Sequence, residues 1–153
     1  MLPFFESMKP QVTPTFFSHI GLTCKDPAAQ EHFYSKYFGF RRARVLPLGD
    51  DQIVFIKSGN FYIELFKAKE QSPLPAPKDD GYAFAGIRHL AFEVESVQAK
   101  LTELGSAVKV MLGPADFGDF IPGWVGAWVA DPEGNIIELN QGYVDQAKPP
   151  ALA

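Results

Sequence analysis

Residues 131–139 read "DPEGNIIEL", a proline- and glycine-containing turn followed by an apolar strand with a glutamate inside it. Residues 62–66 read "YIELF" and place Glu64 between apolar neighbours in the same way as Glu138. Glutamate is uncommon in strands, and a charge on a half-buried strand is costly unless something pairs with it. Two such strands in one short chain indicate that each carboxylate has a partner.

The elements around the two glutamates follow the same order. In each half the pattern predicts a strand, a helix and then three strands, the last of which carries the glutamate. The sequence therefore predicts an α+β fold built from two βαβββ modules. The expected divisions are an N-terminal arm 1–15, a first module 16–67, a linker 68–86, a second module 87–142 and a C-terminal tail 143–153.

The first predicted helix has start and stop signals at both ends. Asp26 is suited to cap it, Pro27 to occupy its first position and Gly39 to end it. The apolar spacing predicts a buried stripe made of Ala29, Phe33 and Tyr37.

The second predicted helix begins after Ser96 and ends at Gly105, with Val97, Leu101 and Leu104 as its buried stripe. A strand over 106–112 and a loop over 113–123, "GPADFGDFIPG", are expected to follow.

Two histidines repeat as the glutamates do, since His19 and His89 both fall in the first predicted strand of their half. Alternate residues of a strand point to opposite faces, so the apolar neighbours can pack on the helices while the imidazoles and carboxylates face away. If the two sheets face each other, all four polar groups point into one concavity. Two imidazoles and two carboxylates gathered there require a cation, and they are usual ligands of a divalent metal ion.

Composition bounds the function further. The 153 residues are 46% hydrophobic and 21% charged, and the net charge of −4 leaves no basic surface for nucleic acid or an anionic membrane. No apolar run reaches membrane-spanning length, and Cys24, the single cysteine, cannot form an internal disulfide. A cytoplasmic protein with a small-molecule substrate is expected, and neither nucleic acid nor membrane as a partner.

Three segments resemble the vicinal oxygen chelate superfamily of glyoxalase I, bleomycin-resistance proteins and extradiol dioxygenases. They are "SHIGLTCKDPAAQEHFYSKYFGF", "GIRHLAFEVESVQAKLTELG" and "WVADPEGNIIELNQ", and the likeness extends over about residues 16–142. This resemblance implies paired βαβββ modules that form a cupped mixed sheet around a metal ion. It also implies a homodimer, and it leaves open whether the site lies within one chain or across two.

The order of ligands most resembles glyoxalase I, with His19, Glu64, His89 and Glu138 at the matching places. The resemblance then implies a metal-dependent lyase or isomerase that moves a proton between adjacent oxygenated carbons through a metal-bound enediolate. Glu138 is the first candidate for the base and Glu64 the second. The ion is nickel, cobalt, zinc, manganese or iron, since such a site accepts each of them. No residues that would hold glutathione are identified.

Three other activities remain open. An extradiol-type ring-cleaving dioxygenase uses two histidines and one carboxylate and does not need Glu64. Epimerases of the methylmalonyl-CoA type commonly have glutamine at that place. A bleomycin-resistance-like protein binds a small molecule without turning it over.

Aromatic residues are expected to line the substrate pocket. Strand alternation places Phe55 and Tyr62 on the ligand-bearing face of the first module, and Trp124 and Trp128 on that of the second. Phe117 and Phe120, which lie beside glycines in the 113–123 loop, are expected to form a lid.

Overall fold

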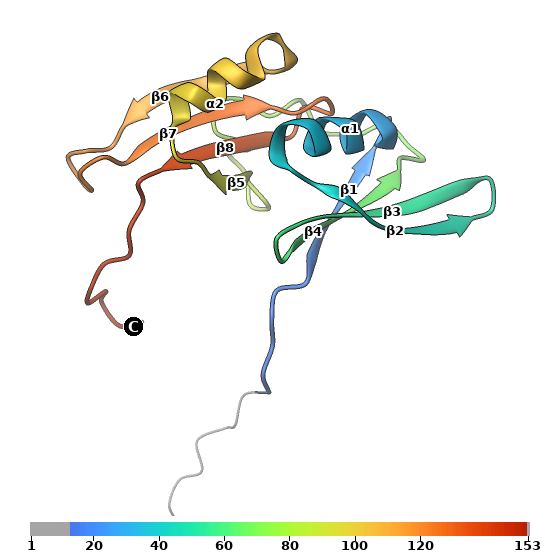
Figure 1. Ribbon diagram of the computed structural model, residues 1–153, viewed down its shortest axis with the longest axis horizontal. Coiled ribbons are helices and arrows are strands. Elements are labelled where there is room, and N and C mark those ends of the chain that lie inside the picture. Colours follow the sequence, from blue (N-terminus) through green and yellow to red (C-terminus); the bar gives the residue numbers. More distant parts are fainter. Residues whose placement is uncertain (1–12, 153) are drawn as a thin grey trace, which may run out of the picture.

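The computed structural model describes residues 13–152, so most of the predicted N-terminal arm lies outside the described residues. The strands form two four-stranded sheets with the orders β1-β4-β3-β2 and β5-β8-β7-β6 (Figure 1). The fold is α+β, as predicted, with the βαβββ order in both halves. The elements are β1 (His19–Cys24), α1 (Pro27–Phe38), β2 (Arg41–Leu48), β3 (Asp51–Ser58), β4 (Phe61–Lys67), β5 (Leu90–Glu93), α2 (Val97–Leu104), β6 (Lys109–Asp116), β7 (Val125–Ala130) and β8 (Ile136–Gln141).

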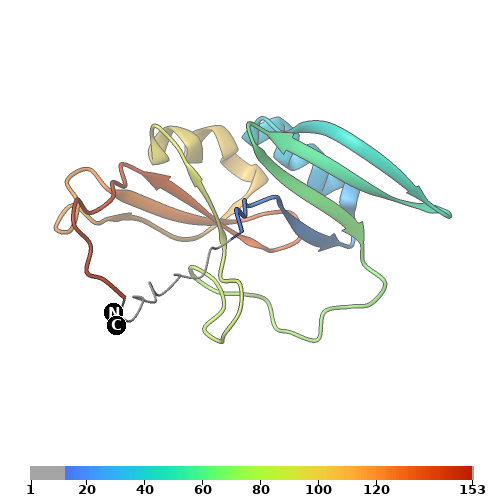
Figure 2. The same cartoon turned by 90° about the horizontal axis from the view of Figure 1, so that it is seen from below.

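Both sheets are mixed in the same way. β1 runs parallel to β4 and β5 runs parallel to β8, while the remaining neighbours are antiparallel. One helix covers the same side of each sheet, so both helices lie behind the sheets in Figure 2 and the opposite faces are open.

The helix boundaries follow the predicted signals. The side chain of Asp26 accepts a hydrogen bond from the amide of Ala29 at 3.0 Å, and Ser96 caps α2 in the same way at 3.2 Å. Gly39 ends α1 with a φ of 67°, a left-handed conformation that glycine adopts without steric cost.

The predicted stripe of α1 was partly wrong. Phe33 is buried, but the other buried residues of this helix are Gln30 and Tyr34, whereas Ala29 is exposed and Tyr37 is only partly buried. Gln30 and Tyr34 face inward because both donate hydrogen bonds to the buried carboxylate of Asp131 in the second module. A pattern of apolar residues does not detect a buried glutamine.

Two boundaries in the second module also differ from the prediction. β5 begins at Leu90, so His89 lies immediately before the strand. β6 extends to Asp116 and includes the first four residues of the predicted 113–123 loop, because Ala115 and Asp116 still pair with Gly126 and Val125. A short 3-10 helix, Gly105–Ala107, precedes β6.

The two modules pack through α1 and β5. Phe92 of β5 lies against Phe38, with 4.7 Å between ring centroids, and also against Tyr34, Phe40 and Phe61. Between the facing edges of β1 and β5 lies a cleft of about 560 Å³, which linker residues and His89 help to line. The modules are therefore one packed unit with a cleft at their junction.

Within residues 13–152 there is no helix with the length and apolar character needed to cross a membrane.

Candidate metal centre

The open face of each sheet carries one of the predicted glutamates. In β4, Ile63 and Leu65 are buried under α1 while Glu64 points to the open side. In β8, Ile137 and Leu139 are likewise buried and Glu138 points to the open side. The period-two alternation of the strands thus separates the carboxylates from the core, as predicted.

His19 and Glu64 form the first pair, on the open face of the first sheet. His19 Nε2 lies 3.2 Å from Glu64 Oε2. The other ring nitrogen of His19, Nδ1, lies 2.9 Å from the hydroxyl of Ser18. A hydroxyl both donates and accepts, so this contact is compatible with either neutral tautomer of His19.

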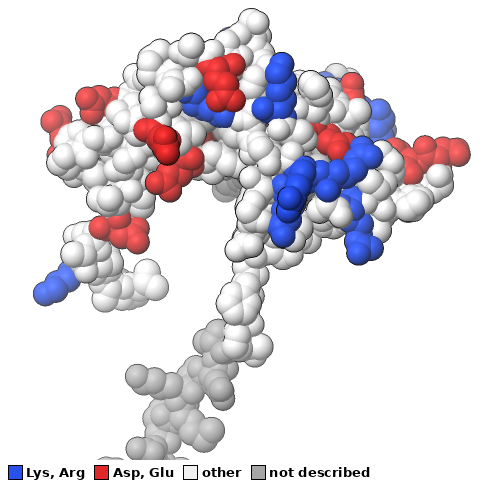
Figure 3. Space-filling model, viewed as in Figure 1, with Lys and Arg blue, Asp and Glu red and all other residues white. Residues whose placement is uncertain are grey.

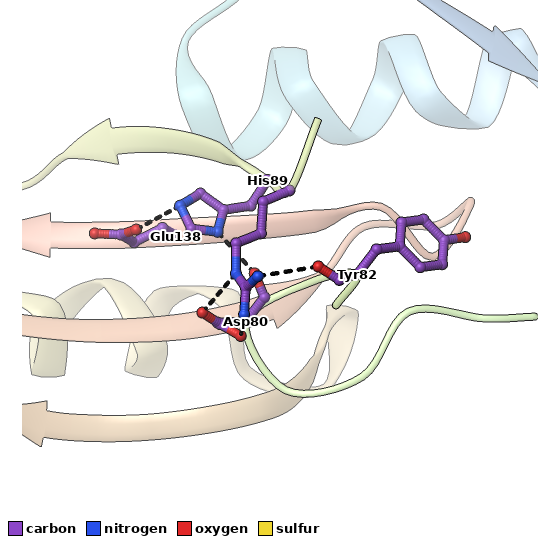
Figure 4. Close-up of polar contacts among 5 residues, drawn as sticks. Asp80, Tyr82, His89 and Glu138 are labelled. Carbon is purple, nitrogen blue, oxygen red and sulfur yellow. Dashed lines mark hydrogen bonds and ion pairs between the residues drawn. The ribbon is translucent and has the colours of Figure 1, made fainter. Parts of the chain in front are cut away.

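His89 and Glu138 form the second pair, and it is the tighter of the two. His89 Nε2 lies 2.7 Å from Glu138 Oε2, and Figure 4 shows the imidazole of His89 pointing at this carboxylate. His89 Nδ1 lies 2.7 Å from the backbone carbonyl oxygen of Asp80 in the linker. Both side chains of the pair are mostly buried, with exposed fractions of 21% and 13%.

Each pair has the spacing of two neighbouring ligands on one ion. Donors about 2.1 Å from an octahedral ion and at right angles to each other are about 3.0 Å apart. The observed nitrogen–oxygen distances of 2.7 Å and 3.2 Å lie on either side of that value. An imidazole nitrogen and a carboxylate oxygen are also the donor types that divalent transition metals accept. The residues present therefore fit such an ion.

The structure brings the four predicted ligands together as two pairs, one on each sheet. Within residues 13–152 of a single chain, no three His, Cys, Asp or Glu side chains are grouped closely enough to hold a metal ion. Each pair on its own supplies only two protein ligands.

The predicted aromatic residues lie around these pairs. Phe55 is the cross-strand partner of Glu64 and contacts His19 edge to face, and Tyr62 is the strand neighbour of His19. In the second sheet Trp128 is the cross-strand partner of Glu138, as predicted.

The two residues of the predicted lid, Phe117 and Phe120, differ in how far they are exposed to solvent. Phe117 packs on Trp124 at 4.7 Å and on Trp128 at 6.2 Å between ring centroids, whereas the side chain of Phe120 is 80% exposed. The indole nitrogen of Trp124 donates to Asn140 at 3.1 Å. Trp128 is buried, and its indole nitrogen has no hydrogen-bond partner within the described part of the chain.

Basic residues share the open face of the first sheet. Arg41 pairs across the strands with Lys57, and Arg44 pairs with Phe55, so all three basic side chains lie on the side that carries Glu64. In Figure 3 the largest group of basic side chains lies over this sheet, and acidic side chains are more frequent over the second module. The open face of the first sheet therefore carries a group of three basic side chains.

Two residues near the second pair were not predicted from the sequence. Asp80 lies in the linker and forms a bidentate ion pair with Arg88, both contacts measuring 2.9 Å. The Arg88 guanidinium holds the pKa of the Asp80 carboxyl below its ordinary value. The Asp80–Gly81 dipeptide is typical of a tight turn, so the sequence did contain a sign that this part of the linker is ordered.

Comparison with known proteins agrees with this architecture. The family model of the Glyoxalase/Bleomycin resistance protein/Dioxygenase superfamily matches residues 16–139. No curated protein sequence matches the chain.

Several solved structures share the fold. A glyoxalase family protein from Enterococcus faecalis is 26% identical, with a TM-score of 0.63, over 82% of this chain and 96% of that one. TnmS3, an antibiotic binding protein from Streptomyces sp. CB03234, is 20% identical, with a TM-score of 0.63, over 87% and 100%. The fosfomycin resistance protein FosX from Listeria monocytogenes, complexed with Mn(II) and a sulfate ion, is 15% identical, with a TM-score of 0.61, over 86% and 96%.

The extent of the family match, the doubled βαβββ topology and the repeated His–Glu pairs lead to one conclusion. The chain belongs to the glyoxalase, bleomycin resistance protein and dioxygenase superfamily.

Proposed function

We propose that this protein is a metal-dependent lyase or isomerase of the glyoxalase I-like type, acting on a small substrate with oxygens on adjacent carbons. The observation that carries the proposal is the pair of matched His–Glu contacts, His19–Glu64 and His89–Glu138, each with the spacing of two neighbouring metal ligands. A carboxylate in both pairs favours a four-ligand site over the two-histidine, one-carboxylate set of a dioxygenase.

The complete site, in this proposal, is shared between two copies of the chain. His19 and Glu64 of one copy meet His89 and Glu138 of the other, and a symmetric homodimer contains two such sites. Three features support this arrangement. Each chain carries two half-sites, both lie on the sheet faces opposite α1 and α2, and apolar side chains such as Leu112 are exposed on the same side as Trp128.

The chemistry divides between the ion and the protein. His19, Glu64, His89 and Glu138 would hold the ion, which would supply Lewis-acid polarisation of the two substrate oxygens. Glu138 takes the proton from the hydroxyl-bearing carbon, and the electron pair of the broken C–H bond moves toward the neighbouring carbonyl. Glu138 then returns the proton to the former carbonyl carbon, and the hydroxyl proton passes from the first oxygen to the second. The hydroxyl thereby becomes the carbonyl and the carbonyl becomes the hydroxyl, so the isomerisation balances without any redox partner.

The surroundings suit this reaction. Trp128 and Ala91 flank Glu138 on the neighbouring strands and limit the access of water to the base. Arg41, Arg44 and Lys57 on the facing sheet favour a substrate that carries an anionic group, since opposite charge raises its local concentration.

The proposal is tested by metal content and proton exchange together. Purified protein reconstituted with Ni²⁺, Co²⁺, Zn²⁺, Mn²⁺ or Fe²⁺ is expected to retain one ion per chain. The loaded protein is expected to exchange the carbon-bound proton of α-hydroxycarbonyl compounds, including thiol adducts of methylglyoxal, with deuterium from solvent. Oxygen uptake with catechols in the presence of Fe²⁺, without proton exchange, would instead indicate the ring-cleaving dioxygenase.

A binding protein without turnover is the second candidate, and the cleft of about 560 Å³ between β1 and β5 favours it. Apolar and aromatic residues such as Leu74, Tyr82 and Ile87 contribute to its lining. Binding of a flat aromatic ligand that persists after every metal ion is chelated would support this function over the enzymatic one.

A further inference from the structure

A contact with the linker fixes a hydrogen on one ring nitrogen of His89, Nδ1. A backbone carbonyl only accepts hydrogen bonds, so the 2.7 Å contact between His89 Nδ1 and the Asp80 oxygen requires hydrogen on Nδ1. Nε2, the other ring nitrogen, faces Glu138 at 2.7 Å and is the atom that would ligate an ion. A histidine that ligates an ion through Nε2 keeps its hydrogen on Nδ1, as the Asp80 contact requires here.

The carbonyl of Asp80 is itself held in place by an ion pair. Arg88 Nε and Nη2 each donate to the Asp80 carboxylate at 2.9 Å, and Arg88 Nη1 donates to the carbonyl of Tyr82 at 3.0 Å (Figure 4). A bidentate arginine–carboxylate contact fixes orientation as well as distance. Arg88 thus ties linker residues on both sides of Gly81 to the position next to His89.

Gly81 allows the linker to approach this closely. Its φ is 132°, and a Cβ atom built on it would lie 2.2 Å from the carbonyl oxygen of Arg88. A side chain at this position would therefore push the turn away from Arg88, and with it the carbonyl of Asp80.

Among residues 13–152, no linker carbonyl contacts the histidine of the first half-site in this way. His19 contacts the hydroxyl of Ser18, which accommodates either tautomer, and its side chain is 39% exposed. The two histidines occupy matching places in the repeat, but the linker acts on only one of them.

We propose that Asp80 and Arg88 are positioning residues for the metal centre. They hold the turn at residues 78–82 so that the Asp80 carbonyl keeps hydrogen on Nδ1 of His89 and leaves Nε2 free to ligate an ion. The part of this inference that concerns an ion rests on the proposed function, whereas the part that concerns the tautomer of His89 does not.

The test compares Arg88→Gln and Gly81→Ala with Arg42→Gln as a matched control. Arg42 forms the same kind of bidentate ion pair with Glu31, at 2.7 Å and 2.6 Å, on the helix side of the first module. Long-range ¹H–¹⁵N NMR of the metal-free protein reports which nitrogen of His89 carries hydrogen. Calorimetric titration with Co²⁺ reports ion affinity, and circular dichroism verifies that each variant is folded.

We expect native His89 to carry hydrogen on Nδ1, and this preference to be lost in Arg88→Gln and Gly81→Ala but kept in Arg42→Gln. The affinity for Co²⁺ is expected to fall about 10- to 100-fold in the first two variants, the usual effect of removing a group that orients a ligand. Arg88→Lys keeps the positive charge but cannot form the bidentate contact with Asp80, so we expect it to restore the Co²⁺ affinity only in part.

Either of two results overturns the inference. One is the absence of hydrogen on Nδ1 of His89 in the native metal-free protein. The other is a tautomer that is unchanged in both Arg88→Gln and Gly81→Ala. If native protein binds no Co²⁺ at all, the proposed function fails, but the NMR comparison still decides whether Asp80 and Arg88 orient His89.

Discussion

Asp131, in the turn before β8, accepts a hydrogen bond at 3.1 Å from the hydroxyl of Tyr34 on α1, so a carboxylate of the second module anchors the helix of the first. The same carboxylate accepts from the side chain of Gln30 and from the amides of Glu133 and Asn135. Burial raises the pKa of Asp131 above its ordinary value, while hydrogen bonds from Asn135, Tyr34 and Glu133 act in the opposite direction. Asp131 therefore holds together both its own turn and the junction of the modules.

Asp131→Ala is expected to lower the free energy of unfolding by at least about 2 kcal/mol, because each buried donor left without a partner costs roughly 1–3 kcal/mol. Denaturant unfolding followed by circular dichroism measures the change. Asp50→Ala, at the exposed turn between β2 and β3, is the control and is expected to stay within about 0.5 kcal/mol of the native protein. Equal stabilities of the two variants would show that the Asp131 network does not hold the modules together.

Cys24 is expected to be unreactive in the folded protein. Burial, with a smaller contribution from Glu133, raises the pKa of its thiol to about 12, so almost no thiolate is present at pH 8. A thiol-reactive disulfide reagent is expected to label the denatured protein within minutes and the native protein only at the rate of unfolding. Rapid labelling of native protein at pH 8 would contradict the buried position of this residue.

Glu64→Gln and Glu138→Gln are expected to separate ligation from proton transfer. Under the proposed function Glu64→Gln weakens ion binding and lowers activity through loss of the ion, whereas it has little effect in a dioxygenase. Glu138→Gln is expected to lower proton exchange by about 10²- to 10⁴-fold at saturating ion, the usual contribution of a general base. Equal exchange rates in native protein and Glu138→Gln, both fully loaded, would exclude Glu138 as the base and move that role to Glu64.

Much of the fold was predictable because local signals determined it. Asp26, Ser96 and Gly39 mark helix ends through backbone conformation and capping, which depend on neighbouring residues only. Strand alternation also depends only on neighbouring residues, and it correctly predicted that Glu64 and Glu138 face away from the buried side of their sheets. These parts of the prediction required no knowledge of distant contacts.

The junction of the modules was not predictable in this way. Gln30 is buried because of Asp131, a residue far along the chain, and hydrophobic periodicity carries no information about such a partner. The same holds for Asp80, whose role depends on Arg88 and His89 lying beside the linker. The docking of the modules also determines that the His–Glu contacts form two separate pairs within one chain. The sequence pattern carries no information about that docking.

The central claim, one ion held between two copies of the chain, is tested most directly by mixing two ligand-deficient variants. One variant carries His19→Ala and Glu64→Ala, and the other carries His89→Ala and Glu138→Ala. Each alone lacks half of every site, but a dimer of the two contains one site with all four ligands and one site with none. Elemental analysis of the co-expressed, doubly tagged heterodimer is predicted to find one ion per dimer and none in either parent. A heterodimer without an ion, from protein whose native form binds one per chain, would contradict the shared site.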